Sequence, residues 1–278
     1  MKKNPLVAPV LKWAGGKRQL LQEISKHIPK KFFTYYEPFL GGGAVLFHLQ
    51  PGKAVVNDIN EELINVYHVI RDNVEELIKS LKKHKNEKGY YYMIRELDRD
   101  KEKYNQLSNI EKASRIIFLN KTCFNGLFRV NSQGQFNVPF GKYKNANIVD
   151  EPTLRAVSNY FNKAKITFKC TDFEEAVKGI SKGAFVYFDP PYDPVSNTSS
   201  FTGYDINGFD KEEQKRLKEL CDKIDRRGVK FLLSNSATDF ILDLYKDYNV
   251  TIVQARRPIN SKGNRRGEVD EVLVKNYE

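Results

Sequence analysis

Residues 33–58 read FTYYEPFLGGGAVLFHLQPGKAVVND, and this stretch decides the fold class. The runs 33–36 and 54–57 are rich in aromatic and β-branched residues, which predicts two strands. Between them, glycines let the backbone approach a ligand, and a helix predicted over 44–49 offers free N–H groups. Asp58 follows the second strand, where a carboxylate can accept from both hydroxyls of a ribose. In this order the elements indicate a nucleoside ligand. The sequence separation between Gly43 and Asp58 is shorter than the roughly 20 residues between glycines and acid in a dinucleotide-binding fingerprint.

Strands and helices continue to alternate along the chain. This alternation predicts an α/β fold whose mainly parallel sheet carries helices on both faces. The last two strands are joined only by an Arg/Gly-rich loop, so they could pair antiparallel. The further predicted strands are 165–170, 185–188, 230–233, 250–254 and 271–274, and the predicted helices are 17–28, 44–49, 60–82, 210–227 and 237–246.

The pattern changes between about residues 70 and 150. Strand signals disappear there, and charged helical stretches at 87–104 and 109–121 lead into a polar, aromatic loop. This segment is typical of a helical insert within an α/β domain. We therefore predict a discontinuous domain of residues 1–69 and 151–278, interrupted by a helical insert of residues 70–150.

Composition narrows the class of protein and its partner. The chain has 278 residues, 40% of them hydrophobic, and a formal net charge of +11. A packed core and a polyanionic partner are therefore expected. Basic residues are concentrated in 1–33, 112–150 and 255–267. These clusters indicate a phosphate-binding surface, and the alternative is that they are ordinary solvent-exposed faces. Three cysteines, no signal-like segment and no apolar run of membrane length predict a cytoplasmic protein without a membrane anchor.

Asp189-Pro190-Pro191-Tyr192 is the most specific motif, and it directly follows the apolar run 185–188. A carboxylate at a strand end points into the ligand crevice of an open α/β sheet. The prolines make the turn rigid and remove two N–H donors, so the carbonyl of Pro190 can stay free beside the Asp189 carboxylate. Two acceptors and the flat ring of Tyr192 suit a planar amino group, which becomes nucleophilic when both its hydrogens are accepted. An ordinary proline turn is the alternative.

At this point the sequence resembles the Dam-type, or D12 class, DNA adenine-N6 methyltransferases, most of all members that modify GATC, including restriction-modification methyltransferases. The resemblance runs from Lys12 to the last strand. It rests on an ordered set of motifs: Lys12-Trp13-Ala14-Gly15-Gly16-Lys17, Glu37-Pro38-Phe39-Leu40-Gly41-Gly42-Gly43, Asn57-Asp58, Asn125-Gly126-Leu127-Phe128-Arg129-Val130-Asn131, Gln135-Phe136-Asn137-Val138-Pro139-Phe140-Gly141, Asp172-Phe173, Asp189-Pro190-Pro191-Tyr192 and Leu233-Ser234-Asn235-Ser236.

The resemblance implies S-adenosylmethionine (SAM) as methyl donor, no metal, and a Rossmann-like sheet with an inserted antiparallel last strand. It makes the helical insert a target-recognition domain for duplex DNA. The enzyme is then expected to act on an adenine that is flipped out of the duplex. The implied catalytic residues are Asp189, Pro190 and Tyr192. The implied cofactor-binding residues are Trp13, Ala14, Gly15, Lys17, Phe39, Gly41, Gly43, Asp58, Asp172, Phe173 and Asp189. The implied DNA contacts are Phe124, Asn125, Leu127, Arg129, Asn137 and Pro139. The loop around Arg265 and Arg266 is a further predicted phosphate contact.

Other functions remain open at this stage. An N6-adenine or amide N-methyltransferase acting on RNA or protein could use the same Asp-Pro-Pro-Tyr chemistry. A nicotinamide-dependent oxidoreductase would leave residues 189–192 unexplained, and a DNA-binding module would need no methyl-transfer site. A cognate restriction endonuclease and nucleoid association of the DNA-bound enzyme are further expectations. Residues 193–209 look like a lid from their composition.

Overall fold

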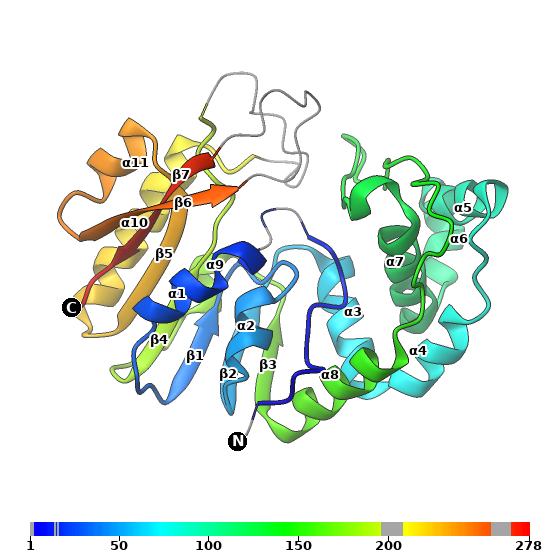
Figure 1. The fold of residues 1–278 in the computed structure, drawn as a ribbon, viewed down its shortest axis with the longest axis horizontal. Coiled ribbons are helices and arrows are strands. Elements are labelled where there is room, and N and C mark those ends of the chain that lie inside the picture. Colours follow the sequence, from blue (N-terminus) through cyan, green and yellow to red (C-terminus); the bar gives the residue numbers. More distant parts are fainter. Residues whose placement is uncertain (1–2, 14, 16, 196–207, 257–267) are drawn as a thin grey trace.

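Seven strands of the described chain form one sheet, which extends from the middle of the molecule to its left side in Figure 1. The computed structural model describes residues 3–13, 15, 17–195, 208–256 and 268–278. The strand order is β3-β2-β1-β4-β5-β7-β6, in which β7 lies antiparallel between β5 and β6 and the other neighbours are parallel. The predicted antiparallel pairing of the last two strands is therefore confirmed. The bounds are β1 Thr34–Glu37, β2 Lys53–Asn57, β3 Lys165–Lys169, β4 Ala184–Phe188, β5 Lys230–Ser236, β6 Asn249–Arg256 and β7 Glu268–Lys275.

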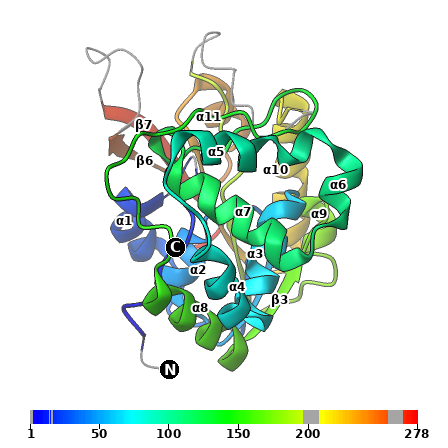
Figure 2. The same cartoon turned by 90° about the vertical axis from the view of Figure 1, so that its right-hand side faces the viewer.

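Helices cover the sheet, and α4 to α7 lie together beside it (Figures 1 and 2). Among the described residues, no helix combines the length and apolar character that crossing a bilayer requires. The bounds are α1 Leu21–His27, α2 Ala44–Leu49, α3 Glu61–Asp72, α4 Val74–Leu81, α5 Lys88–Arg95, α6 Lys101–Gln106, α7 Asn109–Thr122, α8 Glu151–Lys163, α9 Phe173–Ala176, α10 Lys211–Arg226 and α11 Asp239–Leu244, with short 3-10 helices at Lys17–Gln19, Glu96–Arg99 and Phe124–Gly126.

Side chains that alternate along β4 divide the core into two layers. Phe185 and Tyr187 point to the cluster that contains α1, α2, α3, α7 and α8. Val186 and Phe188 point to the cluster beneath α9, α10 and α11. Every residue of β4 is buried, as expected for a parallel strand with helices on both faces. This double burial explains why residues 184–188 form an unbroken apolar run.

Two predicted helices are broken in the structure. The stretch 60–82 divides into α3 and α4 at Asn73, whose φ of −139° is not helical. The stretch 87–104 divides into α5, which ends at Arg95, the 3-10 helix Glu96–Arg99 and α6. The Asp100 carboxylate accepts from the backbone N–H of Lys103 and caps α6. Such short polar side chains compete for backbone hydrogen bonds at positions where an apolar period alone would continue a helix.

The helix α8 was not predicted, although its start carries clear signals. Asp150 accepts from the N–H of Thr153, and Pro152 occupies the first turn, where its missing N–H costs nothing. Asp150 also ends the predicted insert, whose other boundary at residues 69 and 70 falls inside α3. The division into domains therefore stays a prediction.

Candidate active site

The three decisive motifs follow neighbouring parallel strands at one edge of the sheet. The glycine loop follows β1, Asp58 follows β2, and Asp189 follows β4. β1 pairs with β2 on one side and with β4 on the other, so the three motifs converge. The strand order reverses between β1 and β4, and ligands of open α/β sheets bind in the crevice at such a point.

The loop after β1 requires glycine at two positions. Gly41 and Gly43 have φ values of +48° and +67°, in the left-handed region that L side chains rarely adopt. A Cβ on Gly41 would lie 2.9 Å from the Trp13 ring, and a Cβ on Gly43 would lie 2.9 Å from the Phe47 ring. The Tyr67 hydroxyl donates to the Gly41 carbonyl at 2.7 Å and fixes the loop from the other side. The loop is therefore closely packed, and its shape is preset.

Asp58 is held beside this loop. Its Oδ2 accepts from the Gly41 N–H at 2.8 Å, and its Oδ1 accepts from the Asn60 N–H at 3.0 Å. Burial raises the pKa of Asp58, while the two backbone donors lower it. A carboxylate offers about four acceptor positions, so two remain after these bonds. The two free acceptor positions therefore fit the two hydroxyl donors of the SAM ribose.

Aromatic side chains lie next to Asp58 along the edge. The rings of Phe39 and Phe173 are 5.4 Å apart, and Phe173 is covered by the Arg216 guanidinium at 4.3 Å. Asp172 pairs with Arg216 and accepts from the Glu174 N–H, which caps α9. Its carboxylate is 42% exposed, so it retains room to accept from a ligand amino group. Phe173 is 5% exposed, so of these two rings the half-buried Phe39 is the one that offers apolar surface to the adenine end of SAM.

The Asp189 carboxylate is fixed from two sides. Lys17 and Ser234 both donate to Oδ1, at 2.8 and 2.9 Å, and within the described residues no contact falls on Oδ2. Burial raises the pKa of Asp189, and the Lys17 charge opposes this shift. Lys17 is only 6% exposed and also donates to the Gly15 carbonyl at 2.8 Å. Lys17, an expected cofactor residue, therefore contacts the expected catalytic carboxylate as well.

Tyr192 lies against the same ammonium group. Lys17 Nζ is 4.4 Å from the centre of the Tyr192 ring, and the Tyr192 hydroxyl donates to Glu271 Oε2 at 2.8 Å. The Pro191 carbonyl accepts from Gln214 Nε2 at 2.9 Å. Among the hydrogen bonds of the described residues, none uses the carbonyl of Pro190. Within the described residues this carbonyl is therefore without a hydrogen bond, as expected from the two prolines.

Trp13 connects this edge to the helical part of the chain. Its ring packs on Gly41 and stacks on Phe128, with ring centres 4.6 Å apart and planes at 22°. The buried Asn120 amide bonds to the N–H and the carbonyl of Lys12 and to the Gly126 carbonyl. The cofactor loop and the segment that follows α7 therefore share one packed junction.

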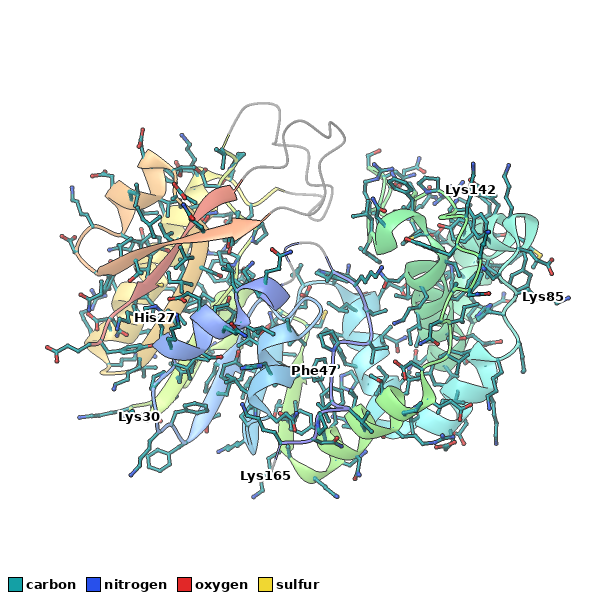
Figure 3. The ribbon with its side chains drawn as sticks, viewed as in Figure 1. His27, Lys30, Phe47, Lys85, Lys142 and Lys165 are labelled. Atoms are coloured by element: carbon teal, nitrogen blue, oxygen red, sulfur yellow. The ribbon has the colours of Figure 1, made fainter. Side chains whose placement is uncertain are left out.

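The resemblance implies a role in target recognition for residues 124–140, called the recognition segment. Apolar side chains hold this segment, and its polar side chains are exposed. Phe128 and Phe136 are buried with rings 5.7 Å apart, while Phe124 is 51% exposed. Arg129 is exposed, and its Nε donates to Asn137 Oδ1 at 2.8 Å. Lys142 lies at the end of the molecule opposite to Lys30 and Lys165, which precede β1 and start β3 (Figure 3). It is therefore on the side to which the carboxyl ends of those strands point. Of the other expected DNA contacts, Asn125 and Pro139 are exposed and Leu127 is half-buried.

Several expected residues are outside the described part of the chain. Ala14, Arg265, Arg266 and most of the predicted lid belong to this group. The sequence analysis also missed side chains that hold residues 189–192, the expected catalytic turn. Ser234 stands in a quoted motif without a role, whereas Gln214 and Glu271 carry no signal that would have singled them out.

Comparisons with known proteins agree with this geometry. The sequence model of the D12 class N6 adenine-specific DNA methyltransferase family matches residues 13–259. The Type II methyltransferase M1.LlaDCHI of Lactococcus lactis subsp. cremoris is 46% identical, over 100% of this chain and 98% of its own. The Type II methyltransferase M.MjaIII of Methanocaldococcus jannaschii is 43% identical, over 98% of this chain and 99% of its own. The DNA adenine methylase of Escherichia coli K12 is 33% identical, over 99% and 96%.

Proposed function

This chain belongs to the D12 class of N6 adenine-specific DNA methyltransferases and is a site-specific DNA adenine methyltransferase with SAM as methyl donor, and we propose that its target is the adenine of GATC. The recognition segment resembles that of GATC-modifying members, and DNA adenine methylases are among the relatives. Methyl transfer from SAM is supported most by the convergence of Asp58, the glycine loop and Asp189 at one edge of the sheet.

We propose that the edge binds SAM along its length. Asp58 accepts from the ribose hydroxyls, and Asp172 accepts from the adenine amino group beside Phe39 and Phe173. The methionine part lies near Gly41, Gly43, Trp13, Gly15 and Lys17. When bound, SAM supplies an electrophilic methyl group on a sulfonium, which is already an activated leaving group. The chemistry therefore requires no metal.

The catalytic turn then acts on a flipped adenine. The N6 amino group of a paired adenine lies in the major groove, engaged in pairing and stacking. The base must therefore leave the duplex, at a cost of a few kcal/mol. Tyr192 stacks on the flipped ring, and Asp189 and the Pro190 carbonyl accept the two N6 hydrogens. These contacts expose the nitrogen lone pair to the methyl group, and orientation supplies much of the acceleration. Asp189 can receive the proton that N6 loses after transfer.

The exposed side of the recognition segment reads the sequence. The Arg129 guanidinium matches the O6 and N7 acceptors of guanine, and Asn137 orients it. Phe124 is exposed at the tip, where it can enter the base stack. Asn125, Leu127 and Pro139 complete the base contacts, and Arg265 and Arg266 grip phosphates. In this proposal residues 70–150 form the target-recognition domain, and residues 1–69 and 151–278 form the catalytic domain.

The Type II names of two relatives motivate one further element of the proposal, a cognate restriction endonuclease that cuts the same site. The test incubates the enzyme with labelled SAM and matched substrates: duplex DNA with GATC, duplexes altered at each position, RNA with the same sequence, and protein. Label in N6-methyladenine of the GATC duplex alone supports the proposal. Equal label in duplexes without GATC rejects the site, and preferential label in RNA or protein rejects the substrate.

A further inference from the structure

Tyr192 is held more firmly than its place in a surface turn requires. Its two neighbours and its hydroxyl are each bonded to a different element of the sheet domain. Gln214 lies at the start of α10, Asn235 lies in β5 and Glu271 lies in β7. These three side chains are 1%, 0% and 9% exposed, so they lie behind the turn rather than in the crevice.

The backbone on both sides of Tyr192 is fixed by two linked amides. Gln214 Nε2 donates to the Pro191 carbonyl at 2.9 Å, and Gln214 Oε1 accepts from Asn235 Nδ2 at 3.0 Å. Asn235 Oδ1 in turn accepts from the Asp193 N–H at 3.0 Å. The two amides thus form a bridge from the residue before Tyr192 to the residue after it. Because each amide is buried, breaking one bond leaves a polar partner unsatisfied.

The side chain of Tyr192 is fixed separately. Its hydroxyl donates to Glu271 Oε2 at 2.8 Å, and β7 carries Glu271 opposite Ser236 of β5. The antiparallel strand inserted between β5 and β6 is what brings this carboxylate to the turn. A phenol bonded to a carboxylate has a set ring orientation, because its ring can no longer rotate freely about χ1 and χ2.

We propose that Gln214, Asn235 and Glu271 are positioning residues that form a three-point clamp on Tyr192 and preset its ring for the flipped adenine. The proposal rests on the proposed function, in which Tyr192 stacks on the target base. None of the three residues touches the substrate. Because they order the Tyr192 ring before the base binds, binding does not include the entropy cost of ordering that side chain.

Two neighbouring residues of β5, Ser234 and Asn235, hold different parts of the catalytic turn. Ser234 orients the Asp189 carboxylate at 2.9 Å, and the next residue, Asn235, orients the backbone beyond Tyr192. One strand, β5, therefore positions both ends of the catalytic turn. This arrangement explains why the buried strand β5 carries the polar side chains of Ser234 and Asn235.

The test is a double-mutant cycle on the Tyr192–Glu271 bond. E271A, Y192F and the double variant are compared with wild type by single-turnover methyl transfer, by calorimetric SAM affinity, and by fluorescence of a duplex carrying 2-aminopurine at the target. E271Q keeps an acceptor for the hydroxyl. D270A removes an exposed carboxylate from the same strand and is the matched control.

E271A and Y192F should each slow transfer about tenfold, the size expected for a hydrogen bond to a charged group, and the double variant should be no slower than the slower single one. 2-Aminopurine should be brighter in E271A, because a mobile ring quenches it less. E271Q and D270A should stay within about threefold of wild type, and SAM affinity should not change. Multiplying effects in the double variant, or transfer by both single variants within twofold of wild type, would overturn the proposal.

A second set of variants tests the bridge formed by the Gln214 and Asn235 amides. The D189A variant distinguishes failure of the clamp from failure of the proposed function. Q214L should slow transfer and brighten 2-aminopurine, while E219A, an exposed change in the same helix, should do neither. If Q214L or E271A fails to fold, Y192F still removes the Glu271 bond from the side of the turn. D189A reports on the proposed function alone. An active D189A enzyme rejects that function, whereas an inactive D189A enzyme with a normal E271A enzyme rejects only the clamp.

Discussion

The catalytic turn and the recognition segment differ in how firmly their functional side chains are held. Asp189 and Tyr192 are held by buried donors and acceptors from β5, β7 and α10, so their geometry exists before any ligand arrives. In the recognition segment, buried Phe128 and Phe136 anchor the chain, and Arg129 stands exposed with Asn137 as its partner. Methyl transfer repeats one geometry at every site, whereas reading a sequence needs side chains that complete their contacts only on DNA.

The largest effect is expected at the turn. D189A removes the carboxylate that accepts from N6 in the proposed function, so single-turnover transfer should fall by about 10² to 10⁴, the range for a lost proton acceptor. DNA affinity should change little, because the residue meets only the flipped base. Rapid-quench transfer assays and filter binding measure the two quantities. A rate within a few-fold of wild type would remove Asp189 from the mechanism.

The cofactor edge should show the next largest effect. D58A removes the proposed acceptor of the ribose hydroxyls and also frees the Gly41 N–H. Hydrogen bonds to charged groups contribute about 1.5–3 kcal/mol, so SAM affinity should fall by roughly tenfold to a hundredfold. Titration calorimetry measures this change, with circular dichroism as the control for folding. Unchanged affinity in a folded variant would contradict the assignment of Asp58.

Arg129 tests the reading side of the comparison. R129A should cost about 1–3 kcal/mol at the cognate guanine and relax discrimination at that position alone. The measurement compares methylation rates on GATC with rates on duplexes altered at the first position. An equal loss on both kinds of duplex would show that Arg129 contacts the backbone and that its assigned role is wrong.

The smallest effect is expected at Lys142, which is exposed and whose φ is +55°. Asparagine tolerates this conformation, so K142N removes the charge without straining the backbone. Binding to all sequences should weaken similarly, and the slope of log affinity against log salt should fall by about one. Salt titrations on cognate and altered duplexes check this. A loss confined to GATC would move Lys142 from phosphate contact to base reading.

The sequence predicted the parts of the molecule that local patterns determine. The strands 185–188 and 54–57, the glycine loop and the acids that follow them lie where periodicity and turn chemistry indicate, because each depends on neighbours along the chain. The start of α8 at Asp150 was missed, because a single capping residue decides it. The helix break at Asn73 was missed because the backbone leaves the helical region there without a side-chain cap.

The supports of the site could not be predicted, because they come from far along the chain. Glu271 approaches Tyr192 only when β7 inserts beside β5, and Gln214 reaches Pro191 only when α10 packs on the sheet. Nothing local distinguishes this Glu or Gln from many others in the sequence. The stack of Trp13 on Phe128 is likewise a product of tertiary packing, and it connects two motifs that the sequence presents separately.

The measurement that tests the central claim most directly is a map of modified bases in DNA from cells that lack adenine methylation and express this chain. We predict N6-methyladenine at GATC sites in cells with the wild-type chain and none in cells with the D189A variant at equal expression. Genomic DNA without N6-methyladenine in the wild-type cells, or the same methylation pattern in the D189A cells, would contradict the account.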